Sequence, residues 1–198
     1  MDFESSYKHN TILMEGALGE RLKREYHIYP DNSVALAGHV YDKNARAALQ
    51  SMWLDYFSIA QKYNLPFMAT TPTRRANKER IAVSPYSETL IDDNVAFVRS
   101  ISGNNMYVGA LIGCKGDAYK ATDVLSENDA QRFHEWTIER FARNNVDFFY
   151  AGIMPALSEA SGMAKALSET GIPYIISFMI RDNGCLIDGT TIHEAILY

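Results

Sequence analysis

Short apolar runs rich in β-branched and aromatic side chains alternate along this chain with longer stretches of helical periodicity. Such alternation is typical of strand–helix units around a parallel sheet, because the crossover helices cover the faces of buried strands. The predicted strands are residues 11–15, 34–38, 66–71, 107–113, 146–153 and 174–180. The pattern therefore indicates an α/β fold with six parallel strands.

The segments between these runs place apolar residues three and four positions apart, as amphipathic helices do. The clearest is 44–63, whose apolar residues share one face. Residues 156–170 lie between Pro155 and Gly171, which favour a helix start and a helix end respectively. Further helices are predicted over residues 17–26, 92–100 and 126–144.

Two kinds of sheet fit this order of elements, an open nucleotide-binding sheet and a closed barrel. The chain contains neither G-x-G-x-x-G nor G-x-x-x-x-G-K-[ST], the glycine-rich loops that hold phosphates in open sheets. A barrel-type sheet is therefore favoured. No linker or low-complexity tract interrupts the sequence, so residues 1–198 are expected to form a single domain.

The charge balance argues against polyanionic partners. Lys and Arg number 19 against 24 Asp and Glu, which gives a formal net charge of −5 and no attraction to nucleic acid or anionic membranes. The two cysteines, Cys114 and Cys185, form no C-x-x-C pair, and no apolar run is long enough to span a bilayer. We expect a cytoplasmic protein with no nucleic-acid or membrane partner.

Candidate binding residues follow the strands, because the carboxyl ends of parallel strands meet at one mouth. Glu15, with Gly16 beside it, either faces this mouth as an acceptor or complements the dipole of the following helix. The loop after 66–71 carries donors suited to a carboxylate ligand, or is a solvated turn. Gly113 allows close approach of a ligand, or only a tight turn. The predicted substrate-binding residues are Glu15, Gly16, Thr71, Thr73, Arg74, Asn77 and Gly113.

Nucleophilic and metal chemistry find little support in the spacing of residues. Cys114 has no histidine near it in sequence, so inert packing is the favoured interpretation. His39, His134 and His193 lack the spacing of metal ligands, and each is expected to be a helix-surface or hydrogen-bonded histidine. No catalytic residue is assigned from the sequence.

The order of these segments resembles the homocysteine S-methyltransferase family. Residues 12–22 resemble the family's opening D-G-G-M-G-T-x-L, and residues 108–116 are similar to its S-I-G-P-x-G segment. Further segments resemble family motifs in the same order: residues 125–127 resemble L-S-x-E, 133–134 resemble F-H, 146–149 resemble G-V-D-L-L and 152–160 resemble E-T-I-P-x-L-x-E-A. Residues 171–189 resemble the family's sixth strand and its exit loop. The resemblance therefore spans nearly the whole chain.

The resemblance implies a zinc-dependent (β/α)₈ barrel that moves a methyl group onto the thiol of homocysteine. Such a barrel typically takes about 250 residues, so this chain is expected to be TIM-barrel-like and incomplete, with about six of eight βα units. The family's three zinc-binding cysteines lie in G-x-N-C and G-G-C-C segments, whose counterparts would fall beyond Tyr198. Zinc is thus expected from the family, while its cysteine ligands are absent from this chain.

Two departures from the family pattern concern binding of the acceptor. Glu15 stands where the family has the aspartate of D-G-G, and Gly152 stands where it has a glutamate expected to hold the homocysteine amine. The partners that the resemblance implies are a small-molecule thiol and a methyl donor.

Three hypotheses follow for function. The first is a homocysteine S-methyltransferase-like protein that is truncated or inactive alone. The alternative is a non-catalytic binding or structural protein whose open barrel edges are completed by oligomerisation, since exposed strand edges are normally covered. A homo-oligomer is therefore expected. A metal-independent lyase or hydrolase with Glu15 as general base ranks last, because it rests on one carboxylate.

Overall fold

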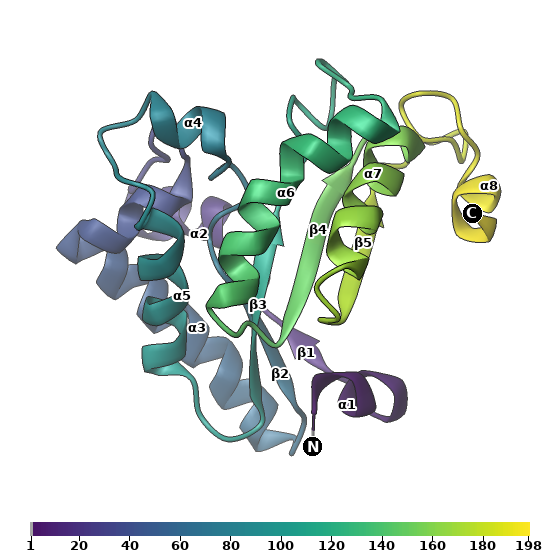
Figure 1. The fold of residues 1–198 in the computed structure, drawn as a ribbon. Coiled ribbons are helices and arrows are strands. Elements are labelled where there is room, and N and C mark those ends of the chain that lie inside the picture. Colours follow the sequence, from purple (N-terminus) through teal and green to yellow (C-terminus); the bar gives the residue numbers. More distant parts are fainter. Residues whose placement is uncertain (1) are drawn as a thin grey trace.

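The computed structural model describes residues 2–198. Within this range five parallel strands form one sheet, in which each strand pairs with the next along the chain. They are β1 (Leu13–Met14), β2 (Phe67–Thr70), β3 (Met106–Ile112), β4 (Phe148–Met154) and β5 (Tyr174–Phe178). Helices cover one side of the curled sheet (Figure 1). This is the incomplete, TIM-barrel-like α/β repeat that the sequence predicts.

Helices separate the strands along the chain. They are α1 (Phe3–His9), α2 (Leu18–Tyr26), α3 (Lys43–Lys62), α4 (Lys78–Ala82), α5 (Leu90–Ile101), α6 (Glu127–Arg143), α7 (Leu157–Ser168) and α8 (Ile192–Leu197), together with the 3₁₀ helix η1 (Leu36–Tyr41). The starts of α3 and α6 are capped by Asp42 and Ser126, whose side chains accept from backbone N–H groups of the first turn. No helix among residues 2–198 is long and apolar enough to cross a membrane.

The prediction of a strand over residues 34–38 is wrong, and the chain therefore has five strand–helix units in the described range where about six were expected. Asp31 and Ala35 form only an isolated bridge, and η1 follows. The segment is buried against helices instead of pairing in the sheet: the side chain of Asn94 in α5 donates to the carbonyl oxygen of Ala37. Tyr86 packs so close to Gly38 that a Cβ added at Gly38 would lie 2.5 Å from the hydroxyl oxygen of Tyr86.

Alternation of side chains across the strands creates two apolar layers. Residues such as Phe67 and Val108 face the helices and belong to the main core. Phe148 and Met68 belong to a second, smaller cluster with Phe3 of α1. The rings of Phe3 and Phe148 are stacked with centroids 4.3 Å apart. The first helix therefore covers part of the sheet surface that the main core leaves free.

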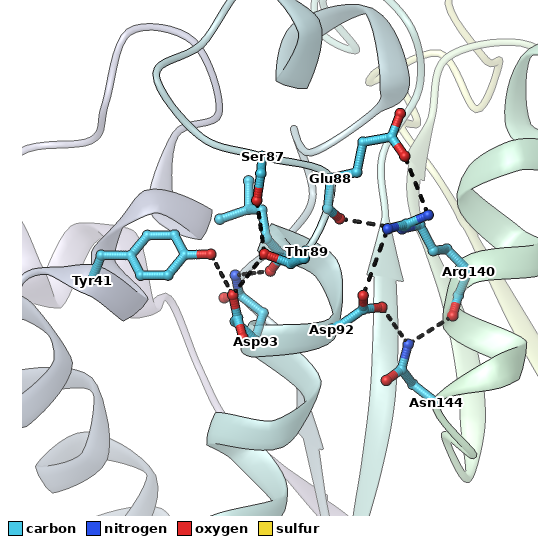
Figure 2. Close-up of polar contacts among 10 residues, drawn as sticks. Tyr41, Ser87, Glu88, Thr89, Asp92, Asp93, Arg140 and Asn144 are labelled. Carbon is cyan, nitrogen blue, oxygen red and sulfur yellow. Dashed lines mark hydrogen bonds and ion pairs between the residues drawn. The ribbon is translucent and has the colours of Figure 1, made fainter.

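Polar side chains join α5 to α6 and to η1 (Figure 2). Arg140 of α6 donates to the carbonyl oxygen of Glu88 and lies within 3.7 Å of the Asp92 carboxylate. Asn144 donates to Asp92, and Tyr41 donates to Asp93 on the other side of α5. Burial and the hydrogen bond to Asp93 raise the pKa of Tyr41 to about 12. These contacts fix neighbouring helices of the outer layer.

Candidate functional site

A cavity of about 480 Å³ opens where β1, β2 and β3 end. The strand pairing of Met14 with Met68 brings the end of β1 next to the end of β2, so that residues 55 positions apart share this wall. The polar and charged side chains that line it are Glu15, Glu20, Lys23, Thr70, Thr71, Arg74, Arg75 and Tyr119. The cavity, called the Glu15 cavity below, lies at the mouth that the sequence predicts.

The carboxylate of Glu15 is held at this mouth by hydrogen bonds from Thr70. Its Oε1 atom accepts hydrogen bonds from the backbone N–H of Thr70 at 2.8 Å and from the Thr70 hydroxyl at 2.5 Å. Its Oε2 atom is buried and has no hydrogen-bond partner among residues 2–198. Burial raises the pKa of Glu15 to about 7, although the Thr70 hydrogen bonds and the side chain of Trp53 oppose this shift. A buried carboxylate with one oxygen outside hydrogen-bond geometry, and with the Trp53 indole N–H nearby, therefore lies in the cavity wall.

Thr71 and Thr73 brace the loop after β2 against β3. The Thr73 hydroxyl donates to the carbonyl oxygen of Leu111 at 2.9 Å, and the Leu111 N–H donates to the Thr71 hydroxyl at 3.2 Å. The two hydroxyl oxygens are 2.7 Å apart, so the proton of Thr71 is left to bridge them. Both hydroxyls are thus engaged within the protein, and of the two residues only Thr71 lines the Glu15 cavity.

The other predicted residues take different positions. The side chain of Asn77 caps α4 by accepting from the Arg80 N–H at 2.9 Å, and it lines neither cavity described here. The carbonyl oxygen of Gly16 accepts from the Tyr56 hydroxyl. Gly113 donates to the carbonyl oxygen of Arg74 at 3.0 Å, and a Cβ at Gly113 would lie 2.5 Å from that oxygen. Gly113 therefore permits the close approach of two loops.

A second cavity of about 280 Å³ lies beside the first. It is called the Arg75 cavity below, and its lining is Arg74, Arg75, Gly113, Cys114, Asp117, Ala118, Tyr119, Gly152 and Ile153. Arg75 was not among the residues predicted for the site, although it follows Arg74 directly in the same donor-rich loop. Its Nη1 atom donates to the carbonyl oxygen of Gly116, which orients the guanidinium.

A buried, hydrogen-bonded pair of side chains supports the loop after β3. Glu159 of α7 and His134 of α6 are almost fully buried and in contact, and Glu159 also accepts from the Lys115 N–H at 2.7 Å. Neither residue was predicted for the site, and the only sequence signals were their places in the F-H and E-A segments. Of the two alternatives predicted for His134, a surface position on a helix or a hydrogen-bonded histidine, the contact with Glu159 favours the second.

Thiolate chemistry at Cys114 is disfavoured by its surroundings. Burial, together with the nearby Glu159 carboxylate, raises the pKa of Cys114 to about 11, so the thiol stays protonated near neutral pH. The sequence interpretation of Cys114 as inert packing agrees with this environment.

The described residues do not fit the zinc centre that the family resemblance implies. Across residues 2–198 no three His, Cys, Asp or Glu side chains converge as a metal site would require. Cys114 is buried and Cys185 is partly exposed, and both are free thiols. The described part of the chain thus contributes a mouth with a carboxylate and guanidinium groups, and no zinc ligand set.

Comparison with known proteins places this geometry in context. The family model described as homocysteine S-methyltransferase matches residues 12–197. The search of curated proteins found no match. Among solved structures, the metallated form of the homocysteine methyltransferase MmuM from Escherichia coli has a TM-score of 0.79 at 19% identity, over 98% of this chain and 72% of that chain. The oxidised form of the same protein has a TM-score of 0.77 at 19% identity, over 96% of this chain and 70% of that chain.

Proposed function

Because the chain belongs to the homocysteine S-methyltransferase family, we propose that its Glu15 cavity binds the amino-acid thiol that accepts the methyl group, homocysteine or a close analogue. The observation that carries this proposal is the Oε2 atom of Glu15, a buried acceptor that makes no hydrogen bond of good geometry in the described chain, although the Trp53 indole N–H lies near this carboxylate. Leaving such an atom unpaired is costly, and a ligand ammonium group would supply the missing hydrogen bond.

The cavity offers a complementary group for each end of an α-amino acid. Glu15 is the acceptor for the ammonium group, while Arg74 and Arg75 are donors suited to the carboxylate. Thr71 and Thr73 hold the arginine loop in place through Leu111. A volume of about 480 Å³ is in the range of small-molecule sites. In this arrangement Glu15, which stands at the position of the family aspartate and is one methylene longer, substitutes in part for the family glutamate that Gly152 replaces.

Chemistry at the thiol needs a group that the described residues lack. A family zinc ion would lower the pKa of the bound thiol, but no ligand set for it exists in residues 2–198. We propose that the 198-residue chain by itself binds the acceptor without methylating it. In a complete catalyst, methylation of homocysteine gives methionine, which would place the protein in methionine biosynthesis.

Binding can be tested with a pair of thiols that differ in one group. Homocysteine carries an α-ammonium group, and 4-mercaptobutanoate lacks it. Isothermal titration calorimetry should show homocysteine binding at least about tenfold tighter to the wild type, because hydrogen bonds to charged groups contribute about 1.5–3 kcal/mol. Glu15→Gln should abolish this preference. Glu135→Gln, at an exposed site on α6, is the matched control.

Equal binding of both thiols to the wild type would overturn the assignment of Glu15. Turnover is a separate assay, with S-methylmethionine, betaine or methylcobalamin as donor. We expect no methionine from the 198-residue chain. Robust turnover without added metal would contradict inactivity while leaving the binding proposal intact.

A second candidate function is a non-catalytic binding or structural protein completed by another copy of the chain. It is favoured by β5, which pairs with β4 alone and whose Tyr174 is 40% exposed. Cavities of about 380 and 410 Å³ lie along this strand, against α8 and α1 respectively. Open strand edges are normally covered. Sedimentation should therefore show a dimer or higher oligomer, and a monomer at all concentrations would contradict this candidate.

We also propose that residues 1–198 act as one domain in the cytoplasm. Support for a single domain comes from one main buried cluster, to which α2, α3, α5, α6, α7, β2, β3 and β4 contribute and against which partly buried residues of β1 and β5 pack. Support for the compartment comes from Cys114 and Cys185, which are both free thiols. Limited proteolysis and fractionation test these two points.

A further inference from the structure

Helix α3 contacts the loop after β1 through two side chains that lie one turn apart. The Tyr56 hydroxyl donates to the carbonyl oxygen of Gly16 at 3.0 Å, and the indole of Trp53 lies near the Glu15 carboxylate. Residues three positions apart share one face of a helix. The same face of α3 therefore contacts both the backbone and the acidic side chain at the edge of the Glu15 cavity.

Trp53 is a buried donor that makes no hydrogen bond of good geometry. Its side chain is fully buried, and its Nε1 atom has no hydrogen-bond partner among residues 2–198. The ring packs edge-on against Phe97 of α5, with centroids 5.7 Å apart. A buried indole N–H normally has an acceptor, because leaving it unpaired is destabilising. Core packing therefore accounts for the ring of Trp53 and leaves its N–H unexplained.

The Oε2 atom of Glu15 is the complementary acceptor. Both atoms are buried and outside hydrogen-bond geometry, and they belong to neighbouring side chains. Both donors of Thr70 are directed at the other oxygen, Oε1. An ionised carboxylate has about four lone-pair sites, two on each oxygen. Oε2 can therefore accept from the indole of Trp53 and from a ligand ammonium group at the same time.

The protonation state of Glu15 decides the strength of this contact. A donor near a carboxylate favours the ionised form, so the indole lowers the pKa of Glu15, while burial has the larger effect and raises it to about 7. Because Oε1 already accepts two hydrogen bonds, the proton of the neutral form belongs on Oε2. Ionisation of Glu15 therefore frees Oε2 for Trp53 and for the ligand together.

The surrounding charges do not change in the same pH range. The titratable and charged groups that line the cavity with Glu15 are Glu20, Lys23, Arg74, Arg75 and Tyr119. The ion pair with Lys23 lowers the pKa of Glu20, and lysine, arginine and phenol groups keep their charge near pH 7. In η1, which contacts α3, burial lowers the pKa of His39. Glu15 is therefore the group whose charge changes near pH 7 at this site.

We propose that Trp53 is a positioning residue of the acceptor site, whose indole N–H donates to Oε2 of ionised Glu15 and holds the carboxylate with a remaining lone pair directed into the cavity. This inference rests on the proposed function, because the acceptor is the ligand that uses this lone pair. Trp53 does not line the Glu15 cavity. Its effect on binding therefore passes through Glu15.

The indole N–H signals in two-dimensional NMR test this hydrogen bond without any ligand. The 198-residue chain has two tryptophans, Trp53 and Trp136. The Trp53 proton should move downfield with a midpoint near pH 7, because a hydrogen bond to an ionised carboxylate is stronger than one to a neutral carboxyl. Trp136, on α6 beside Lys78 and Arg140, is the internal control and should not follow this transition. In Glu15→Gln the transition should be lost.

Trp53→Phe removes the N–H and keeps an aromatic ring in the core. The midpoint of Glu15 ionisation, followed by the carbon-13 signal of its carboxyl group, should rise by about half a pH unit or more, and homocysteine affinity at pH 7 should fall about threefold or more. Phe57→Leu is the matched control, because Phe57 is buried one turn further along α3 and packs against Phe67. It should lower stability and leave the midpoint unchanged.

The outcomes separate this inference from the proposed function. A Trp53 signal that does not follow Glu15 in the wild type would overturn the role of Trp53, whether or not Trp53→Phe folds. An unchanged midpoint in folded Trp53→Phe would overturn it as well. Titration of the Trp53 signal without homocysteine binding would overturn the proposed function, and the positioning role with it. Homocysteine binding to a chain whose Trp53 signal is independent of pH would overturn the role of Trp53 alone.

Discussion

The Nε2 atom of His134 in α6 lies 3.0 Å from the Oε1 atom of Glu159 in α7, and each side chain is only 1% exposed. The same oxygen accepts a hydrogen bond from the backbone N–H of Lys115 in the loop after β3. One buried carboxylate therefore connects two outer helices to a loop whose neighbouring residues line the Arg75 cavity.

Removing this carboxylate should destabilise the whole chain. Glu159→Ala leaves His134 and the Lys115 N–H without their partner, and leaving a buried polar group unsatisfied costs about 1–3 kcal/mol. Urea unfolding should show a loss of this size in the free energy of unfolding. Glu139→Ala, on the exposed surface of α6, should change it by less than about 0.5 kcal/mol. A similar small effect for Glu159→Ala would show that the pair is not a stabilising contact.

Local sequence signals were sufficient for most of the outer layer. The predicted helices 44–63 and 126–144 are observed as Lys43–Lys62 and Glu127–Arg143. The strand predicted over residues 34–38 is wrong because this segment packs against Asn94 of α5 and against Tyr86 in the loop before α5, and not against another strand. A short apolar run shows that a segment is buried, but not whether it pairs with strands.

The sequence predicted a site residue only where the end of a strand fixes the position of that residue. Glu15 follows a strand, so its place at the mouth could be inferred from the order of elements. Arg75 and Glu159 were missed because their roles depend on contacts across 41 and 25 residues, with Gly116 and His134. Asn77 carried a donor-rich signal but caps a helix, since the same side-chain chemistry serves both purposes.

Gly113→Ala should disturb both cavities. The added Cβ would lie 2.5 Å from the Arg74 carbonyl oxygen and 2.7 Å from its Cγ atom, so the arginine loop must move. Overpacking of this kind costs about 1–3 kcal/mol, and homocysteine affinity should fall with it. Thermal unfolding and calorimetry measure the two effects.

Gly19→Ala is the matched control for that substitution. A Cβ at this position in α2 would meet only Leu36 Cδ1, at 3.6 Å, which is an ordinary contact. Alanine is also favoured over glycine in a helix by about 1 kcal/mol. The control should be neutral or stabilising, and wild-type stability for Gly113→Ala would contradict the close approach of its two loops.

Arg140→Gln tests the polar contacts between α5 and α6 in Figure 2. The substitution removes the hydrogen bond to the Glu88 carbonyl and the ion pairs with Glu88 and Asp92. Because the side chain is 22% exposed, we expect a loss of only about 1 kcal/mol in urea unfolding. Arg143→Gln on the same helix should have no measurable effect, and equal effects of the two changes would contradict a specific role for Arg140.

The stability of the chain should depend on pH through Glu15. In the folded chain its carboxyl keeps a proton up to about pH 7, whereas the ordinary pKa of 4.5 applies after unfolding. Between these pH values the folded state binds more protons than the unfolded state. The free energy of unfolding therefore falls by up to about 3 kcal/mol as pH rises from 4.5 to 7, and it changes little above pH 7. Glu15→Gln should remove this decline in urea unfolding, and Glu135→Gln should retain it. An unchanged slope in Glu15→Gln would contradict the assignment.

Homocysteine binding should show the opposite dependence on pH. The ligand ammonium group is bound by the ionised form of Glu15, whose pKa of about 7 leaves the carboxyl protonated in more acidic solution. Affinity should therefore rise from pH 6 to pH 8, with a limiting slope of about tenfold per pH unit below 7. Calorimetry in buffers of different ionisation enthalpy should detect proton release on binding at pH 6.

The ligand 4-mercaptobutanoate carries the same type of thiol without the ammonium group, so its affinity should not follow this curve. Tighter homocysteine binding at pH 6 than at pH 8 would mean that the neutral carboxyl is the binding form, and that the ammonium group is held elsewhere.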